Sequence, residues 1–312
     1  MDRGIFIFSL DCEGKWGMAD ALERDPHTWL TTSDLTAVYR KLIDVFDRFD
    51  IPATWAFVAA FAHREEEVRD CPYLVENPLL WRDGDWTASF RAALQSGNAD
   101  GWMCPAALEI VASSGRHEIA SHGFSHVPLA ENLIEAQVFD REMIELSQFW
   151  GRRGVRPTTF VFPRNQPGYL ERLGSAGFEA YRPPAKLERQ RNQIARLCRL
   201  AGEFNVLEKP ENHGRSGTPG TLPPAILLNH RAGGRRFVPM KITLERVRRL
   251  LDNAITTRRV VHLYSHPHNF LTGDHQLELL CATLQLVSER VKQARMRVMT
   301  QATYARDVLG SA

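Results

Sequence analysis

Two histidines, His122 and His126, stand four residues apart directly after a short apolar segment that is predicted to form a strand. Imidazoles with this spacing on one turn present both rings to the same side, within reach of one metal ion. Gly123 lies between them and permits a tight turn. A chain with eleven histidines often contains such a pair by chance. The spacing therefore indicates a metal site only together with other candidate ligands.

Two acids, Asp11 and Glu13, follow the apolar segment of residues 5–10. Residues two apart on an extended backbone point to the same face, about 7 Å apart at Cα. Two carboxylates directed into one cavity repel each other unless a cation or a proton lies between them. Taken alone, the pair could instead face water at the end of a strand. Cys12 should point away from both acids, which argues against it as a ligand.

A second histidine pair with the same spacing, His262 and His266, has a different geometry. His262 lies inside the apolar segment 260–264, and four strand residues span about 13 Å, so this pair cannot share an ion. We predict that His262 is a core histidine. His266 follows the strand and can exchange a proton near neutral pH. His268 is an alternative proton donor or a substrate contact, and Asn269 is a further candidate contact.

Arg164 and Asn165 follow a third predicted strand. An arginine at this place can orient a carboxylate through paired hydrogen bonds, or it can face solvent. Asn165 is a candidate substrate contact. Several tryptophans offer faces on which sugar rings stack, or they pack in the core instead; these are Trp16, Trp81, Trp86 and Trp102.

Strand-length apolar segments alternate with helix-length amphipathic segments along the chain. The predicted strands are Gly4–Leu10, Ala53–Val58, His117–Ser121, Thr159–Phe162, Phe178–Tyr181, Ala225–Asn229, Val260–Tyr264 and Arg297–Met299. The predicted helices begin with one capped at Ser33 or Asp34 and continue with Pro105–Ser114, Asn132–Trp150, Gly168–Ala176, Leu187–Leu200, Thr243–Thr257, Asp274–Gln293 and Thr300–Leu309. This alternation predicts parallel strands in an α/β fold. Because the candidate residues follow several different strands, we expect a distorted (β/α)7–8 barrel.

The chain contains no segment typical of a linker, so we predict one domain over residues 1–312. Two regions interrupt the alternation of strands and helices. Residues 64–104 are expected to form an insertion, and residues 203–224, rich in glycine and proline, a long loop.

The composition excludes several classes of partner. A net charge of +2 gives no reason to expect nucleic acid or an anionic membrane as a partner. The longest apolar run, residues 55–62, is far shorter than the roughly 20 residues of a membrane span. Five scattered cysteines in no paired spacing indicate reduced thiols. The chain begins with a strand rather than a targeting segment, so we expect a cytoplasmic protein.

These motifs resemble those of the polysaccharide deacetylase family, also called the NodB-homology domain or carbohydrate esterase family four. Residues 9–14 (SLDCEG) are similar to its first motif, and residues 117–126 (HEIASHGFSH) closely resemble its metal-binding second motif. Residues 160–165 (FVFPRN) stand where the family has an Arg-x-Pro-Tyr segment, and residues 263–267 (LYSHP) are similar to its last motif. The resemblance covers most of the chain, from Phe6 to about Val308, and implies a barrel of the NodB-homology type.

The resemblance also implies roles for single residues. Asp11 would be the base and His266 the acid, with Arg164 holding Asp11 in its ionised form. Glu13, His122 and His126 would bind a divalent metal, most simply Zn²⁺. A backbone N–H near Asn165 would stabilise the oxyanion. The implied activity is removal of an N-acetyl group from a sugar, in a surface polysaccharide precursor such as that of the O-antigen.

Two departures from the family pattern leave alternatives open. Cys12 occupies the position after the base where a ligand aspartate is usual, as in a variant subgroup whose first motif reads Asp-x-Glu. The family's fourth motif is not recognisable, and Asn229-His230-Arg231 stands roughly in its place. A metal-free cyclic amidase on the same fold, or a glycan-binding module without catalysis, are the alternative functions.

Overall fold

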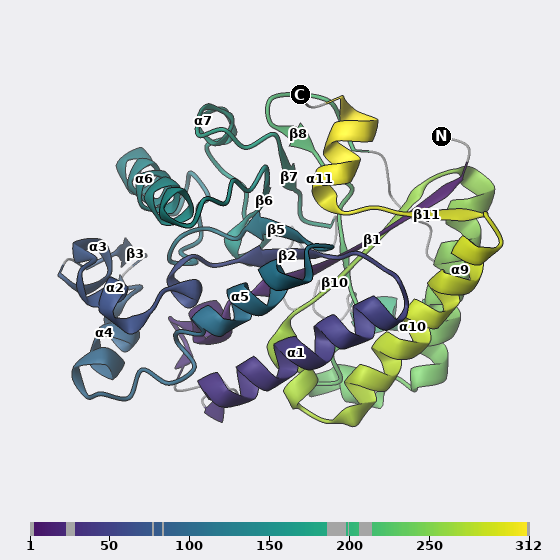
Figure 1. The fold of residues 1–312 in the computed structure, drawn as a ribbon, viewed down its shortest axis with the longest axis horizontal. Coiled ribbons are helices and arrows are strands. Elements are labelled where there is room, and N and C mark those ends of the chain that lie inside the picture. The colour runs from purple at the N-terminus through teal and green to yellow at the C-terminus, as the bar shows by residue number, and fades with distance from the viewer. Residues whose placement is uncertain are drawn as a thin grey trace.

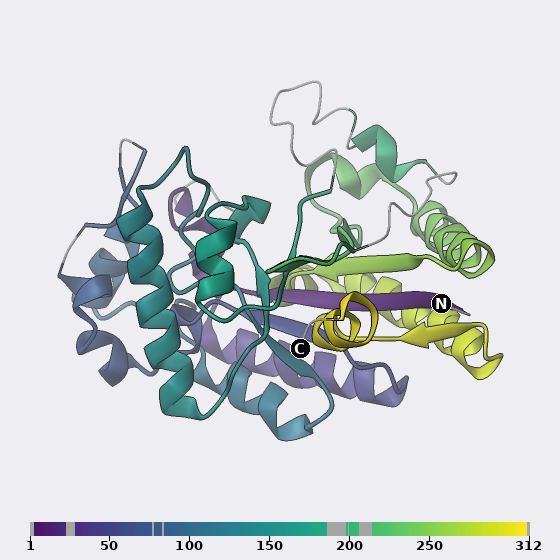
Figure 2. The same cartoon turned by 90° about the horizontal axis from the view of Figure 1, so that it is seen from above.

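The computed structural model of the chain describes residues 3–22, 29–76, 78–82, 84–185, 198, 200–205 and 214–310. In this part of the chain, parallel strands form a curved sheet with helices packed around it (Figures 1 and 2). From edge to edge the order is β8 (Gly220–Thr221), β7 (Ala180–Arg182), β6 (Thr159–Val161), β5 (Glu118–Ser121), β2 (Thr54–Phe57), β1 (Gly4–Cys12), β10 (Val260–Ser265) and β9 (Ile226–Leu227). The short strand β11 (Met296–Val298) pairs with the first residues of β1.

The two edge strands, β8 and β9, follow each other in the chain, so the sheet must curl until its edges come close. The connecting residues bond to both neighbours: the N–H of Leu222 donates to the carbonyl of Tyr181 on β7, and the N–H of Leu228 donates to Tyr264 on β10. In the described residues no hydrogen-bonded ladder joins β8 to β9. The predicted α/β barrel is thus confirmed, in a distorted and incompletely closed form.

Strand β1 lies at the centre of the sheet and is buried on both faces. Ile5 and Ile7 pack on one side in a cluster with Val260 of β10. Phe8 packs on the other side against Phe46, with ring centroids 5.3 Å apart. Parallel strands covered on both faces have such nearly continuous apolar sequences. The polar residues at the carboxyl end of β1 are therefore an exception that calls for a chemical reason.

Helices connect the strands and cover the outer face of the sheet. Helix α1 (Thr32–Arg48) begins after Thr31, whose side chain accepts a hydrogen bond from the N–H of Asp34 at 3.0 Å, as expected for a helix cap. The longer helices that follow are α5 (Pro105–Ser114), α6 (Ala136–Arg153), α9 (Met240–Thr257) and α10 (Asp274–Lys292), with the shorter α7 (Leu170–Ser175) and α11 (Gln301–Tyr304).

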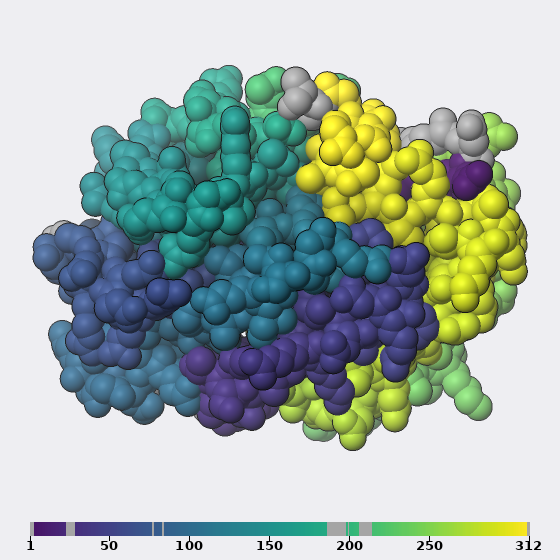
Figure 3. Space-filling model, viewed as in Figure 1, coloured from purple at the N-terminus to yellow at the C-terminus, as the bar shows by residue number. Residues whose placement is uncertain are grey.

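Residues 64–104 form the predicted excursion from the alternation. They contain α2 (Glu65–Arg69), α3 (Pro72–Val75), a short hairpin of β3 (Leu80–Trp81) and β4 (Gly84–Asp85), and α4 (Ala88–Gln95). In Figure 1 this segment, which we call the insertion, lies beyond the carboxyl end of β1. The space-filling view shows its blue atoms against the teal atoms of the segment that contains α6 (Figure 3).

All eight predicted strands are present, each overlapping an observed strand. Strand β8 was not expected, because its glycine- and proline-rich surroundings are typical of a loop. Two of its residues nevertheless pair with β7. The helix predicted over Leu187–Leu200 lies almost entirely outside the described residues. Within the described part of the chain, every helix is too short or too polar to span a membrane.

Candidate active site

The candidate residues converge at the carboxyl ends of the strands. Asp11 is the penultimate residue of strand β1, His122 follows β5 directly, and His266 follows β10 directly. Because β5, β2, β1 and β10 are neighbours in the sheet, these residues reach one mouth of the barrel. The structure thus brings together the groups that the sequence analysis placed in one site.

Three ligand atoms meet at one point. Nε2 of His126 lies 2.9 Å from Oε2 of Glu13, and Nε2 of His122 lies 3.3 Å from the same oxygen. The two imidazole nitrogens are 3.2 Å apart. All three side chains are less than a tenth exposed. Lone pairs packed this closely and shielded from water require a cation or shared protons among them.

The protonation of His122 suits metal binding. Its Nδ1 lies 2.8 Å from the carbonyl oxygen of Val161, a pure acceptor, so Nδ1 carries the proton and donates it to that oxygen. Nε2 is then left with a lone pair that points at Glu13 and His126. Ligand histidines in metal sites are oriented in the same way by a carbonyl or carboxylate behind the ring. The donor set of two imidazole nitrogens and one carboxylate oxygen fits a divalent ion such as zinc.

Asp11 is held by Arg182 rather than by a surface group. Two guanidinium nitrogens of Arg182 donate to the two carboxylate oxygens of Asp11, at 2.8 and 2.6 Å. Arg182 is 1% and Asp11 is 3% exposed. Burial by itself raises the pKa of Asp11, but the charge of Arg182 and its paired hydrogen bonds outweigh that effect and lower the pKa. The site therefore keeps this carboxylate ionised.

Glu13 and His266 lie close to each other and to Asp11. Nε2 of His266 is 3.6 Å from Oε1 of Glu13 and 3.9 Å from Oδ2 of Asp11. Burial acts to raise the pKa of Glu13, yet the neighbouring imidazoles, first His266 and then the two ligand histidines, hold it well below its usual range. The His266 side chain is 23% exposed, so it forms the open rim of a site that is otherwise closed.

The prediction that Arg164 holds Asp11 is wrong. Arg164 has a left-handed backbone, with φ of 55°, and its guanidinium forms a paired contact with Asp20. It also lies over the rings of Trp81 and Trp86, at 5.5 and 5.0 Å from their centroids. This conformation carries the guanidinium away from Asp11, and Arg182 takes the position instead.

Asn165 lies beside the site, as predicted, and its side-chain oxygen accepts a hydrogen bond of 3.1 Å from Arg182. The expected oxyanion donor is not found at this residue. The N–H of Asn165 already donates to Phe162, and the N–H of Gln166 donates to Pro163. Neither is available for a reacting oxygen.

His268 and Asn269 flank His266. The rings of His266 and His268 are 5.2 Å apart and tilted by 32° to each other. Nδ2 of Asn269 is 3.4 Å from Nδ1 of His266, close enough to orient that ring. His268 is 6% exposed, so of the two histidines His266 is the one open to a substrate.

The proposal that Trp16 contacts substrate is wrong. Trp16 is fully buried, its Nε1 donates to the carbonyl of Trp102 at 2.9 Å, and the two rings are 5.0 Å apart. Trp102 and Trp86 are each 1% exposed and Trp81 is 7% exposed. These tryptophans pack the insertion onto the barrel, and none presents an open face to a sugar ring.

Two other predictions are confirmed. His262 is completely buried: its Nδ1 donates to Pro223, and burial together with the charge of Arg182 lowers its pKa to about 3, so it is a neutral core residue. Cys12 belongs to the core cluster on the outer side of β1, where burial raises the pKa of its thiol well above the ordinary value. It faces away from the ligand atoms.

The sequence analysis missed Arg182 and the polar chain behind it. Nη1 of Arg182 also donates to Oγ of Ser9 at 3.0 Å, and that hydroxyl lies 3.0 Å from Nε2 of His262. Since Nδ1 of His262 carries the proton, the Ser9 hydroxyl donates to Nε2. The predicted strand Phe178–Tyr181 ended one residue before the arginine, whereas β7 includes it. A strand extended by one residue would have placed Arg182 among the candidates.

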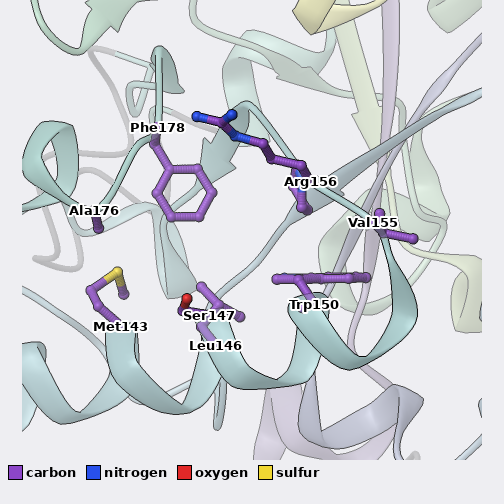
Figure 4. Close-up of a pocket in the computed structure, with 10 residues that line it drawn as sticks. Met143, Leu146, Ser147, Trp150, Val155, Arg156, Ala176 and Phe178 are labelled. Atoms are coloured by element: carbon purple, nitrogen blue, oxygen red, sulfur yellow. The ribbon is translucent and has the colours of Figure 1, made fainter.

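The cavity drawn in Figure 4 belongs to another part of the molecule. It has a volume of about 310 Å³ and lies between α6 and the segments that precede β6 and β7, lined by residues that include Trp150, Arg156 and Phe178. These segments mark the amino ends of the strands. The cavity therefore opens at the end of the barrel opposite the candidate site.

Comparison with known proteins agrees with this geometry. Residues 22–164 match the sequence family described as polysaccharide deacetylase, a region that contains His122, His126 and Arg164. No curated protein matches the chain. Among solved structures, a provisionally named polysaccharide deacetylase from Mycobacterium smegmatis is 15% identical, with a TM-score of 0.59 over 99% of this chain and 92% of the other.

The barrel is also shared with proteins of other activities. A 4-α-glucanotransferase from Thermococcus litoralis is 12% identical, with a TM-score of 0.51 over 98% of this chain and 41% of its own. Such a likeness indicates a common fold and no more. The family match, over residues 22–164 of the 312, identifies a polysaccharide deacetylase domain in this part of the chain. The solved structures add the likeness of the barrel fold.

Proposed function

We propose that this protein is a metal-dependent deacetylase that removes an N-acetyl group from a sugar. The observation that carries the proposal is the meeting of Glu13, His122 and His126 within one ligand sphere, directly beside a buried, ionised Asp11. Three converging lone pairs and a carboxylate held beside them are together suited to amide hydrolysis.

Glu13, His122 and His126 would hold the divalent ion, for which we propose zinc. When bound, such an ion lowers the pKa of water and polarises a carbonyl group. Val161 keeps Nε2 of His122 available as a ligand, and the low pKa of Glu13 keeps its carboxylate ionised. Glu13 therefore faces the cation as an anion, and His122 turns Nε2 rather than Nδ1 toward it.

Asp11 is the proposed base. Its bond to Arg182 fixes the carboxylate plane and keeps it ionised, while the position 3.9 Å from His266 leaves it at the edge of the open rim. His266 is the proposed acid, which protonates the departing amine. Asn269 orients its ring from behind. General base and acid groups each contribute about a hundredfold or more in rate.

For the substrate, we propose an acetamido sugar in a precursor of a surface polysaccharide, such as that of the O-antigen. The five cysteines include none that is bonded to another, which supports a reducing, cytoplasmic location. We further propose that residues 1–312 act as one domain. The insertion supports this, because it packs Trp86 directly beside the ligand residue His126, at 6.3 Å between rings.

Release of acetate from acetylated oligosaccharides and nucleotide-sugars, with and without a chelator, tests the proposal. Purified protein should contain near-stoichiometric zinc, and chelation should abolish acetate release. His126→Ala should lose both metal and activity. His117→Ala is the matched control, because it removes another buried imidazole from the opposite end of the strand that precedes His126. Activity on cyclic amides that survives chelation would contradict the proposal.

A further inference from the structure

The turn of residues 123–126, which carries His126, is bound through its backbone carbonyl groups to the segment that follows β2. The carbonyl oxygens of Gly123 and Phe124 accept hydrogen bonds from the N–H groups of Ala59 and Ala60, at 3.0 and 2.9 Å. These two alanines follow strand β2, the neighbour of β5 in the sheet. The turn after β5 is therefore hydrogen-bonded to the loop after β2. This contact fixes one side of the turn and leaves the N–H groups of the turn pointing the other way.

A single carboxylate receives those N–H groups. Oε2 of Glu142, on α6, accepts from the N–H of Phe124 at 3.0 Å and from the N–H of Ser125 at 3.1 Å. Oε1 accepts from the hydroxyl of Ser125 at 2.5 Å and from the hydroxyl of Tyr73 at 3.0 Å. Glu142 is completely buried. Four donors on one enclosed carboxylate form a rigid attachment of the turn to α6.

The insertion contributes to the same attachment. Tyr73 belongs to α3, and Trp86 follows the hairpin of the insertion. Nε1 of Trp86 donates to the carbonyl of Ser125 at 2.8 Å. Ser125 is therefore bound through its N–H, its hydroxyl and its carbonyl, one residue before the ligand.

The turn needs such restraint because its conformation is unfavourable. His126 has φ of 63° and Gly123 has φ of 82°. A glycine adopts the left-handed region readily, whereas a histidine is rarely found there unless its surroundings impose it. The imposed conformation is the one that brings Nε2 of His126 to within 2.9 Å of Glu13.

We propose that Glu142 is a positioning residue that fixes His126 in its ligand conformation by binding the peptide groups of residues 124 and 125. It contacts neither the ligand atoms nor a substrate, and it acts only through the turn. This inference rests on the proposed function, because it assigns His126 as a metal ligand. It also gives the insertion a role, since Tyr73 and Trp86 complete the same attachment.

Glu142→Gln tests the inference, because the amide replaces one acceptor oxygen with a donor beside two backbone N–H groups and two hydroxyls. Glu145→Gln is the matched control on the same helix: Glu145 is also buried, but its partners are Arg141 at 2.5 Å and Cys71 at 3.9 Å. Cobalt(II) affinity is measured from the visible absorption of the bound ion. Crystal structures of the metal-free variants give the distance from Nε2 of His126 to Glu13.

We expect Glu142→Gln to weaken cobalt binding by about tenfold or more and to lengthen the His126–Glu13 distance. Glu145→Gln should change neither. If Glu142→Gln does not fold, Tyr73→Phe and Ser125→Ala each remove one donor, and each should weaken cobalt binding to a smaller degree, whereas Glu145→Gln should not.

The two possible failures can be told apart. If the wild type binds cobalt and Glu142→Gln binds it equally well with His126 in place, the positioning role is wrong and the proposed function stands. If the wild type binds no cobalt, the proposed function fails. The crystal structure of Glu142→Gln then decides alone, and an unmoved His126 overturns the positioning role.

Discussion

The two ends of the barrel each hold an acid whose surroundings shift its pKa, and the two shifts have opposite signs. At the carboxyl end, Asp11 faces the guanidinium of Arg182, and its pKa is lowered. At the amino ends of β2, β5 and β6, Glu118 accepts hydrogen bonds from the hydroxyls of Thr54 and Thr159 and from the N–H of Ala302. Burial raises the pKa of Glu118, and its neutral donors only partly offset that effect.

The comparison shows that burial alone does not decide whether a carboxyl group is ionised. A full positive charge at hydrogen-bond distance keeps a buried acid ionised, which a proton acceptor needs. Around Glu118, hydroxyl and amide donors offset burial only in part, so its pKa stays raised while its hydrogen bonds join neighbouring strands. Under the proposed function, the barrel uses one chemical group for reaction at one end and for structure at the other.

The largest expected effect comes from removing the acid at the reactive end. Asp11→Asn should lower the rate of acetate release by about a hundredfold to ten-thousandfold, because the amide cannot accept a proton. Glu118→Gln, the same change at the other end, should leave the rate within about threefold of the wild type. Steady-state assays compare the two, with near-ultraviolet circular dichroism to check folding. Equal losses in both variants would remove the distinction between the ends.

A second effect, on stability, comes from removing the charge beside Asp11. Arg182→Met leaves a buried carboxylate without its partner, which we expect to lower the free energy of unfolding by about 3–5 kcal/mol. Urea unfolding monitored by fluorescence measures it. Arg172→Met, which breaks the exposed pair with Asp140, is the control and should cost about 1 kcal/mol or less. A loss as small as the control's would mean that Asp11 is not ionised in the wild type.

The smallest effect is a difference in pH dependence. The folded-state pKa of Glu118 is raised above 4.5, so its contribution to stability is fully present below about pH 4.5 and is lost as the pH rises through the folded value. Glu118→Gln removes this loss, so the stability of the variant relative to the wild type should rise as the pH increases above about 4.5. The Asp11 contribution has the opposite sign, because it is lost only as the pH falls below about 3.8.

Urea unfolding of both proteins at several pH values measures the difference. If the free energies of unfolding of the wild type and Glu118→Gln change with pH in parallel, the pKa of Glu118 is not raised by folding. That result would remove the contrast between the two ends.

The sequence by itself determined what depends on short spacing. His122 and His126 converge because they share one turn, and Asp11 and Glu13 share one side because they are two residues apart after a strand. The strands were recognisable because both faces of each are apolar, and they place their carboxyl ends at one mouth whatever the details of the connections.

The tertiary structure decided which distant side chains meet. Arg182 comes from β7, four positions from β1 in the sheet, and it reaches Asp11 across the interior of the barrel. Arg164 ends beside Asp20 because its own backbone is left-handed, and Trp16 is buried because the insertion packs over it. Spacing along a chain specifies neighbours a few residues apart, whereas such long-range contacts depend on how the whole barrel curls.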